Sequence, residues 1–523
     1  MYSVIMPHFH FSGLILEKMQ RLVSALEDPR TPLTMVFTTF LAVVIIRNIF
    51  EGYATGLGVD PYPYVHYTLF YLTVALSIVA LFHFLIKEQV VKLIRVVFSS
   101  FIFLIIAPLA DLIILRGKRY SMSYLLPGVH EDILLRYFTF FGDFRPVGTP
   151  MNGGGLIGIT PGIRIEIAIV LVFSAFFIFL KTKSHIRTLV GVIALYTVIF
   201  TYLAFPYVTG AIGSLIPYFA KYTQPLFIHI YTLLSLLLGV FLSYRASPYI
   251  FLILIGDIRL FRLLHYLGFF VLGVMLGMPN MNNTVPVVGF ILLPLSVAFA
   301  WVFSVMTNNI ADIEIDRISN TDRPLVAGTI DPALYQRISW FFLVLAFFTS
   351  LVVDKRASYL ILVFISVYFV YSMPPLRLKR VPILSKMAIG INTFIMTVLG
   401  LTFVTNSSML TFPGRIGWFI VVSFTLAANL IDIKDYAGDK AAGIMTLPSV
   451  LGLRRAKHVI SLFIVGTYVW GYLLIKKPLF IPVVATFSVL ELYLINRKDY
   501  SDRQAIGVYL LSIIVIGLLL IFR

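Results

Sequence analysis

The sequence predicts an all-α protein that crosses the membrane many times, and three observations support this. Hydrophobic residues make up 59% of the 523 residues and charged residues only 12%, which is far from the balance of a soluble globular protein. Apolar runs of about twenty residues recur along the chain, and each is long enough to cross the hydrocarbon core of a bilayer. Helices of that length satisfy their own backbone hydrogen bonds in lipid. A soluble fold is therefore excluded.

The net charge of +17 is compatible with binding to nucleic acid or to the headgroups of membrane lipids. In a membrane protein, basic residues are expected in cytoplasmic loops and at lipid headgroups, so we do not expect nucleic-acid binding. The chain has no cysteine, which excludes disulfides, thiolate nucleophiles and cysteine metal sites. The first residues lack the pattern of a cleaved signal peptide, and we expect the first spanning helix to act as its own insertion signal.

The first half of the chain predicts a short amphipathic lead followed by six spanning helices. The lead covers residues 1–32, and the expected spans are residues 33–50, 66–86, 92–115, 165–182, 187–205 and 226–244. This module, residues 1–250, resembles no family that we recognise. It could recruit a substrate, bind a partner membrane protein, or only lengthen the lipid-facing wall.

The first half also contains a long interval between two spans and an acidic residue inside a span. The interval 116–164 is too long for an ordinary connection, and we expect a partly structured or re-entrant loop there. Asp111 lies inside the third expected span, and an intramembrane carboxylate is a functional candidate by default. It also lies near the helix end, where Arg116 or water could reach it, so both interpretations stay open.

The boundary between the halves falls near residues 244–262, where basic residues bracket an apolar run too short to span a bilayer. An interfacial helix is expected there. Nine further spans fit the second module, residues 251–523, and they are residues 262–277, 286–314, 334–353, 357–373, 384–404, 415–433, 456–475, 479–494 and 504–522.

Acidic residues gather at the end of the second of these nine spans. On a helix that turns about 100° per residue, the side chains of one polar face are Asn308, Asn309, Asp312 and Asp316. Glu314 points away from that face. A carboxylate at the edge of the membrane costs free energy, so this face is a candidate site.

A second acidic stripe lies at the end of the sixth span, where Asp432, Asp435 and Asp439 are spaced three and four residues apart. These three align on one face if the helix continues through them. Divalent cations such as Mg²⁺ prefer oxygen ligands and are commonly held by a few carboxylates together with substrate phosphates. The two stripes therefore predict a shared cation site.

At these residues the sequence resembles the UbiA-type intramembrane prenyltransferases over about residues 258–523. The first motif appears as Asn308-Asn309-x-x-Asp312-x-x-x-Asp316, followed by Arg323-Pro324-Leu325. The second is matched by Asp432, Asp435, Gly438 and Asp439, then Thr446-Leu447-Pro448. Between them, residues 371–379 resemble the basic loop of the family. One position departs from the pattern, because Asn309 stands where an aspartate is usual.

The resemblance implies a nine-helix bundle that transfers a polyprenyl group from an allylic pyrophosphate to a membrane lipid or aromatic acceptor, with Mg²⁺ as cofactor. It implies five catalytic aspartates, Asp312, Asp316, Asp432, Asp435 and Asp439, which together with Asn309 are the candidate metal ligands. The candidate substrate-binding residues are Asn308, Asn309, Arg323, Arg377 and Lys379. Asparagine keeps one coordinating oxygen but removes a negative charge, so at position 309 it would weaken the hold on Mg²⁺ without abolishing it.

The distribution of basic residues predicts the orientation in the membrane. Lys and Arg of the second half fall mainly on one side of the nine spans, together with both aspartate motifs and the loop 371–380. Under the positive-inside rule that side is cytoplasmic. A non-catalytic scaffold or lipid carrier derived from the same fold remains the alternative. The second motif resembles that of family members acting on lipid glycerol phosphates, chlorophyllides or quinone precursors more than that of members acting on 4-hydroxybenzoate.

Overall fold

A computed structural model of the chain describes residues 8–55, 61–114, 120–122, 137–138, 156–158, 160–213, 224–282, 285–441 and 445–521, and of Asp439 it describes the backbone alone. The described residues contain 13 helices that are long and apolar enough to cross a membrane. The apolar helix α22 (Phe480–Asn496) is shorter, at 17 residues. The chain is thus an integral, multi-pass α-helical membrane protein, and a helix lies at every span predicted from the sequence.

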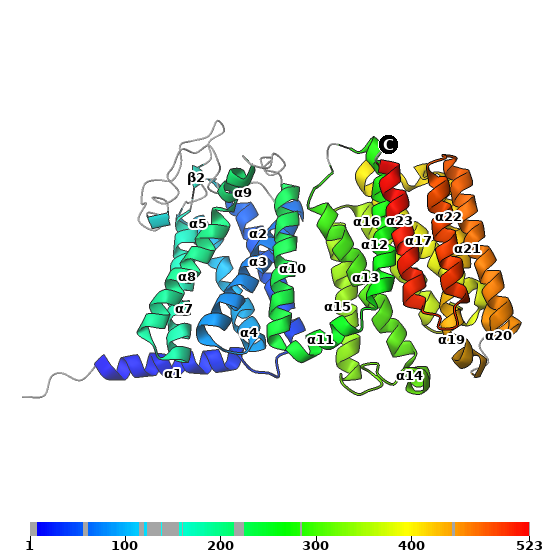
Figure 1. Ribbon diagram of the computed structural model, residues 1–523. Coiled ribbons are helices and arrows are strands. Elements are labelled where there is room, and N and C mark those ends of the chain that lie inside the picture. The colour runs from blue at the N-terminus through cyan, green and yellow to red at the C-terminus, as the bar shows by residue number, and fades with distance from the viewer. Residues whose placement is uncertain are drawn as a thin grey trace, which may run out of the picture. The chain divides into compact units, whose positions relative to one another are not determined.

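The chain divides into two units, Met1–Pro248 and Tyr249–Arg523. In the first unit (blue to green in Figure 1) the helices are α1 (His8–Leu26), α2 (Leu33–Thr55), α3 (Pro61–Ile86), α4 (Val90–Ser100), α5 (Ile106–Ile114), α7 (Pro161–Thr182), α8 (His185–Leu203), α9 (Phe205–Gly213) and α10 (Gln224–Ala246). A 3₁₀ segment, Phe101–Ile105, links α4 to α5 and completes the third predicted span.

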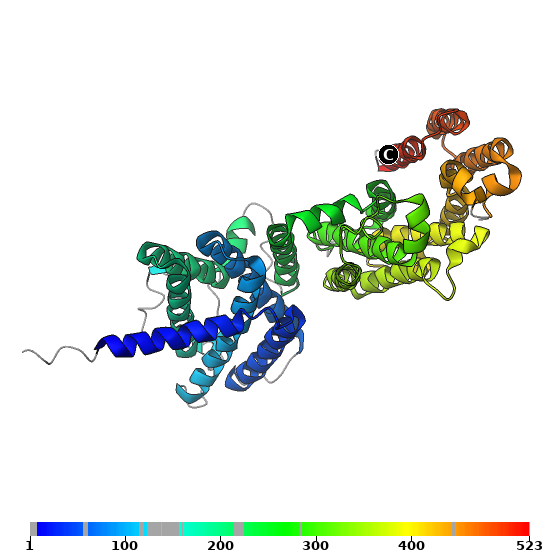
Figure 2. The ribbon, with the colours of Figure 1, turned by 90° about the horizontal axis from the view of Figure 1, so that it is seen from below.

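The helix α1 lies across the ends of the spanning helices of its unit, as Figures 1 and 2 show from two directions. Polar contacts tie the turn after α1 to that end. Lys181 at the end of α7 pairs with Glu27 at 2.6 Å, and the Arg95 guanidinium donates to the backbone oxygens of Pro29 and Thr31. A helix held in this orientation agrees with the amphipathic lead predicted for residues 1–32.

The long interval 116–164 is described only in part. Its strands β1 (Tyr120–Met122) and β2 (Leu156–Gly158) pair in parallel, and the rest of the predicted loop lies outside the described residues. Asp111 is buried and accepts hydrogen bonds from the Thr160 hydroxyl and, at 2.7 Å, from the Gly162 amide. These bonds join α5 to the N-terminus of α7, which favours a structural role for this carboxylate.

The second unit begins with the short helix α11 (Pro248–Gly256), at the position of the predicted interfacial helix. Its long helices are α12 (Leu260–Gly277), α13 (Gly289–Ala311), α15 (Pro332–Leu351), α16 (Lys355–Ser372), α17 (Pro382–Thr405), α18 (Gly414–Ala427), α21 (Leu453–Ile475), α22 and α23 (Asp502–Ile521). Short helices α14 (Ile313–Ser319), α19 (Leu430–Ala441) and α20 (Leu447–Leu451) carry or follow the acidic motifs.

Two glycines allow α12 and α17 to approach each other closely. A Cβ atom on Gly273 would lie 2.0 Å from the Thr397 carbonyl oxygen, and one on Gly400 would lie 2.0 Å from that of Phe270. Small residues at such crossings let helix backbones pack together in membranes. Around this crossing the core of the unit contains large buried side chains, including Tyr266, Phe269 and Phe364.

The structure corrects the sequence prediction at the two acidic motifs. We predicted single helices over residues 286–314 and 415–433, but each is broken where its motif begins. Asp312, with φ −108° and ψ 7°, separates α13 from α14, and residues 428–429 separate α18 from α19. Side chains cap backbone carbonyl groups at both breaks. Arg377 donates to the Ala311 oxygen, and Asn429 donates to the Leu426 oxygen.

Candidate active site

The first acidic motif meets the basic loop at Asp312. Its carboxylate pairs with Lys379, and it accepts a 2.7 Å hydrogen bond from the Arg377 guanidinium. Asn308, one turn earlier, accepts from the Lys379 ammonium at 3.3 Å and from the Ser372 hydroxyl at 3.1 Å. Both motif residues thus share one cation from a loop more than sixty residues away in sequence.

The backbone of the basic loop helps to place these cations. Arg377 has φ 42° and ψ 55°, in the left-handed region that non-glycine residues seldom adopt. Holding a residue there costs on the order of 1–3 kcal/mol. The two bonds from its guanidinium, to the Ala311 carbonyl oxygen and to Asp312, are the contacts that this conformation makes.

Asp316 pairs with Arg323, the arginine of the Arg-Pro-Leu segment, and accepts a 3.0 Å bond from the Asn320 amide. The predicted face of four polar residues is therefore divided between two sets of contacts. Asn308 and Asp312 contact Lys379, whereas Asn309 and Asp316 contact Arg323. The break in the helix at Asp312 accompanies this division. Glu314, predicted to point away, forms an exposed pair with Arg317.

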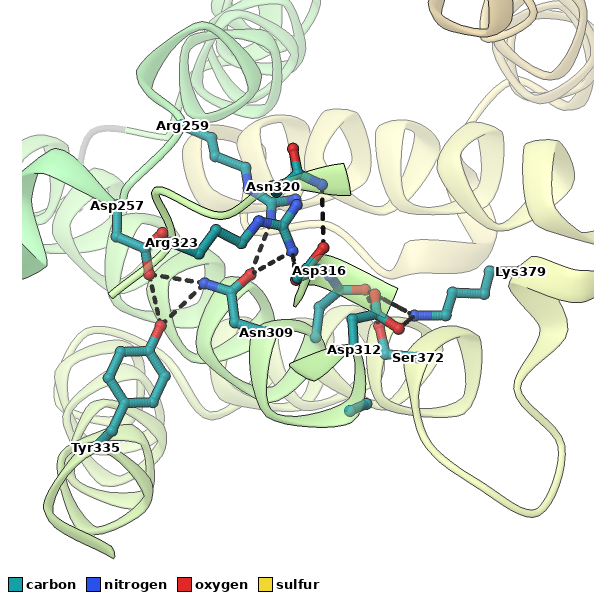
Figure 3. A network of polar contacts seen from close by, with 12 residues as sticks. Asp257, Arg259, Asn309, Asp312, Asp316, Asn320, Arg323, Tyr335, Ser372 and Lys379 are labelled. Atoms are coloured by element: carbon teal, nitrogen blue, oxygen red, sulfur yellow. Dashed lines mark hydrogen bonds and ion pairs between the residues drawn. The ribbon is translucent and has the colours of Figure 1, made fainter. Parts of the chain in front are cut away.

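Asn309 is only 2% exposed, and it lies at the centre of the network in Figure 3. Its amide oxygen accepts from Arg259 at 2.7 Å and Arg323 at 3.3 Å. Its amide nitrogen donates to Asp257 at 2.7 Å and to the Tyr335 hydroxyl at 3.0 Å. Since an amide side chain has two donor hydrogens and two acceptor lone pairs, all four are used within the chain. A metal role for Asn309 remains a prediction.

Three ionisable groups in these loops have shifted pKa values, and burial is the largest cause in each. Burial raises the pKa of Asp257, against the opposing effect of the hydrogen bond from Tyr335. It lowers the pKa of Arg259 to about 10, assisted by the like charges of Arg262 and Arg323. It also lowers the pKa of Lys379, although Asp312 acts in the opposite direction. Each charge is thus held by its neighbours in a poorly solvated place.

The second motif presents its carboxylates differently. Asp432 is 6% exposed and pairs with Lys386 through Oδ1, while its buried Oδ2 has no hydrogen-bond partner among the described residues. Asp435 is exposed. The backbone of Asp439 continues the same helix, α19, as the spacing predicted, and its side chain lies outside the described residues.

A cavity of about 2540 Å³ inside the second unit joins the two motifs. Its polar lining includes Asn308, Asp312, Asp316, Arg323, Arg377, Lys379, Asp432 and Asp435. Its apolar lining is rich in aromatic rings, including Tyr266, Trp301, Tyr368, Phe419, Phe424 and Tyr509. Asn309 does not line this cavity within the described residues. The cavity can accept a ligand with one charged and one apolar end.

The residues fit a divalent cation in chemistry, since carboxylate oxygens are its preferred ligands. The unpartnered Oδ2 of Asp432 and the exposed carboxylate of Asp435 offer such oxygens toward one cavity. Among the side chains that the structure describes, however, no group of three or more carboxylates or histidines is gathered closely enough to hold a metal. Asp312, Asp316 and Asp432 are instead each paired with a basic side chain.

Sequence reasoning missed several residues of the site. Arg259 and Lys386 belong to the charge pattern that predicts membrane orientation, yet they also contact Asn309 and Asp432. Asp257, before α12, and Tyr335, in α15, complete the network around Asn309. No local pattern marks the last two, because they approach Asn309 from segments far away in the chain.

Residues 266–514 match the model of the UbiA prenyltransferase family. Among curated proteins, digeranylgeranylglyceryl phosphate synthase of Thermococcus gammatolerans is 29% identical over 172 residues, which are 32% of this chain and 59% of that protein. The Pyrococcus horikoshii protein of the same name is 23% identical over 48% of this chain and 91% of its own length.

Two further proteins with other names are also similar to this chain. A probable homogentisate phytyltransferase 2 from Oryza sativa subsp. japonica is 26% identical over 39% of this chain and 58% of that protein. A solved UbiA homologue from Archaeoglobus fulgidus, bound to GPP and Mg²⁺, aligns with a TM-score of 0.43 and 20% identity over 52% of this chain and all of that one. Residues 266–514, which match the family model, lie in the unit that carries the site.

Proposed function

We propose that this chain transfers a polyprenyl group from an allylic pyrophosphate to a membrane-embedded acceptor, because residues 266–514 match the model of the UbiA prenyltransferase family. The observation that carries the proposal is the cavity of about 2540 Å³ that joins both acidic motifs and the basic loop to a wall of aromatic rings. A polyprenyl pyrophosphate has one highly charged end and one apolar end, so it requires a cavity with this polarity.

The charged end of the donor belongs at the ion pairs of Asp312, Asp316 and Asp432. In this proposal, Arg323, Arg377 and Lys379 bind the pyrophosphate, with the two arginines able to make bidentate contacts. When these cations turn to the pyrophosphate, they release the carboxylates of Asp312 and Asp316. The candidate ligands of Mg²⁺ are then Asp312, Asp316, Asp432, Asp435 and Asp439. Mg²⁺ would neutralise the negative charge that develops on the leaving pyrophosphate.

The apolar end of the donor belongs among the aromatic side chains. Loss of pyrophosphate leaves an allylic cation, which the faces of Trp301, Tyr368 and their neighbours can stabilise by about 2 kcal/mol or more when water is excluded. The hydroxyls of Tyr266 and Tyr368 share a hydrogen bond, and Trp301 donates to the Ile258 carbonyl oxygen. These bonds hold the rings in place so that they can shield the cation.

We also propose that the site faces the cytoplasm, because Lys and Arg of the second unit gather at the loops that carry both motifs. The acceptor is a lipid or aromatic compound, in keeping with the names of the curated relatives. The role of the first unit, including a partner membrane protein bound through residues 1–250, stays a prediction.

The test uses the purified full-length chain in lipid nanodiscs with radiolabelled geranylgeranyl pyrophosphate. The acceptors are an isoprenoid glyceryl phosphate and a set of hydroxylated aromatic compounds, each with and without Mg²⁺. We expect a metal-dependent prenylated product that disappears in Asp312→Ala and Asp435→Ala and persists in the exposed control Glu314→Ala. Failure of the chain to bind the donor at all would contradict the proposal and favour a scaffold or lipid carrier.

A further inference from the structure

The cavity of the second unit is also lined by an acidic residue that belongs to none of the described ion pairs, Glu491. This carboxylate, on α22, is 1% exposed and lines the cavity. Neither of its oxygens has a hydrogen-bond partner among the described residues. Buried polar groups in folded proteins are nearly always hydrogen-bonded, so an unpartnered carboxylate beside a cavity calls for a ligand.

Neighbouring helices supply further polar groups around Glu491. The Tyr509 hydroxyl, on α23, is buried and unpartnered among the described residues, and it also lines the cavity. Both Tyr509 and Tyr468 lie close enough to Glu491 for electrostatic interaction. Tyr468 donates to the Ser512 hydroxyl at 3.1 Å, which leaves Glu491 and Tyr509 as the groups still able to bond a ligand.

Packing holds this region in a defined shape. The ring of Tyr509 lies 5.3 Å from that of Phe424 and 5.9 Å from that of His265. His265 is itself held through Nε2 by the Thr393 hydroxyl at 2.8 Å. A rigid wall with two free polar groups is suited to orienting a small polar part of a mostly apolar molecule.

The chain also places Glu491 at the same end of the unit as the second acidic motif. It lies within two turns of the C-terminus of α22, which ends at Asn496. Just beyond, the Tyr500 hydroxyl donates at 2.8 Å to the carbonyl oxygen of Leu430, at the start of the helix that carries Asp432. The unpartnered groups are therefore at the depth where the reacting end of the donor would lie.

We propose that Glu491 and Tyr509 form the subsite for the acceptor, in which Glu491 accepts a hydrogen bond from an acceptor hydroxyl. This inference rests on the proposed transferase function and deepens it by assigning the acceptor side of the cavity. The ligand is an apolar molecule with a neutral hydroxyl group at this position. Glu491 offers no positive charge to a phosphate, so a phosphate-bearing acceptor must direct that group toward the basic residues.

Binding is tested with a matched pair of probes, tritiated 4-octylphenol and its methyl ether, on the full-length chain in nanodiscs with empty nanodiscs as blank. The ether cannot donate a hydrogen bond, and a buried polar group left without its hydrogen bond lowers affinity by about tenfold or more. We expect the phenol to bind at least about tenfold more tightly than the ether. We expect Glu491→Leu to remove this preference and Glu491→Gln, which keeps an acceptor oxygen, to keep part of it.

The control is Ser488→Ala, a buried residue of the same helix that does not line the cavity within the described residues. It should keep the preference for the phenol. Donor binding and the midpoint of thermal unfolding should not fall in Glu491→Leu, since removal of a buried unpartnered carboxylate does not destabilise a fold. A phenol preference that survives in Glu491→Leu would overturn the inference.

Transfer assays separate this inference from the proposed function. If prenyl transfer occurs and the KM for the acceptor is unchanged in Glu491→Leu, the inference is wrong and the function stands. If the phenol binds through Glu491 but no acceptor is prenylated, the hydroxyl subsite stands and the transferase proposal fails. Support for both is an acceptor KM that rises at least about tenfold in Glu491→Leu while the donor KM stays constant.

Discussion

Two adjacent asparagines at the end of α13 have opposite surroundings. Asn308 lines the large cavity, where it accepts bonds from Ser372 and Lys379 beside Asp312. Asn309 is buried on the other side, where four groups from three separate segments use its entire hydrogen-bonding capacity. The first belongs to a surface that can exchange partners with a ligand, and the second to a buried network whose two arginines, Arg259 and Arg323, reach the same cavity.

The difference explains how this chain accommodates asparagine at a position where the family usually has aspartate. The carboxylate missing from position 309 is present 2.7 Å away in Asp257, within range of Arg259 and Arg323. The two arginines therefore still have a negative partner. In this account the cavity side carries the chemistry, whereas the Asn309 side positions the helix end and Arg323.

The largest loss of prenyl-transfer activity is expected from a substitution at Asp312, which lines the cavity. Asp312→Asn removes the negative partner of both Arg377 and Lys379 and a candidate ligand of Mg²⁺. We expect kcat/KM for prenyl transfer to fall by at least about 100-fold, the scale on which single electrostatic contacts to a transition state act. The unfolding temperature should also fall, because Arg377 and Lys379 lose a largely buried negative partner, so kcat/KM is measured well below the unfolding transition of both chains. Activity within a factor of three of the unaltered chain would show that Asp312 has no part in the reaction.

A smaller loss is expected at the second motif. Lys386→Met leaves the buried carboxylate of Asp432 without its cation, and we expect a fall of about 10- to 100-fold in kcat/KM because the ligand geometry is no longer held. The matched control is Lys434→Met, since that lysine is exposed and lies 3.6 Å from Asp502. Equal losses in the two variants would mean that the effect is one of general charge.

The network around Asn309 is tested by exchanging the positions of its carboxylate and its amide. Asp257→Asn alone should lower the free energy of unfolding by about 1–3 kcal/mol, because Arg259 and Arg323 lose their buried negative neighbour. The exchange Asp257→Asn with Asn309→Asp keeps one amide and one carboxylate and should recover more than half of that loss. A double-mutant cycle measured by thermal unfolding checks this. Losses that simply add would show that the network is not a unit.

The smallest effect is expected at Asn308, whose two bonds are long and shared with other groups. Asn308→Ala removes acceptors for Ser372 and Lys379, while Asp312 still holds the lysine. A net hydrogen bond contributes about 0.5–1.5 kcal/mol, so the KM for the donor should rise only about two- to tenfold. Initial rates at varied donor concentration measure it. A loss equal to that of Asp312→Asn would place Asn308 among the metal ligands.

The length of the apolar runs was enough to predict the spans, since a helix needs about twenty apolar residues to cross the hydrocarbon core. It did not reveal the breaks at Asp312 and at residues 428–429, because these depend on Arg377 and Asn429 capping freed carbonyls. The acidic motifs were visible through their spacing. Asp257, Tyr335 and Glu491 were not, since their roles arise from packing between distant segments and from burial.

The most direct test of this account is the Mg²⁺ dependence of donor binding, measured side by side for Asp312→Asn and Asn309→Asp in nanodiscs. We expect Asp312→Asn to weaken Mg²⁺-dependent donor binding by at least about tenfold, because a candidate ligand of the metal is lost. We expect less than about a threefold change in this binding for Asn309→Asp. That side chain faces Asp257, Arg259, Arg323 and Tyr335. Tighter Mg²⁺ binding in Asn309→Asp would contradict the account and assign position 309 to the metal.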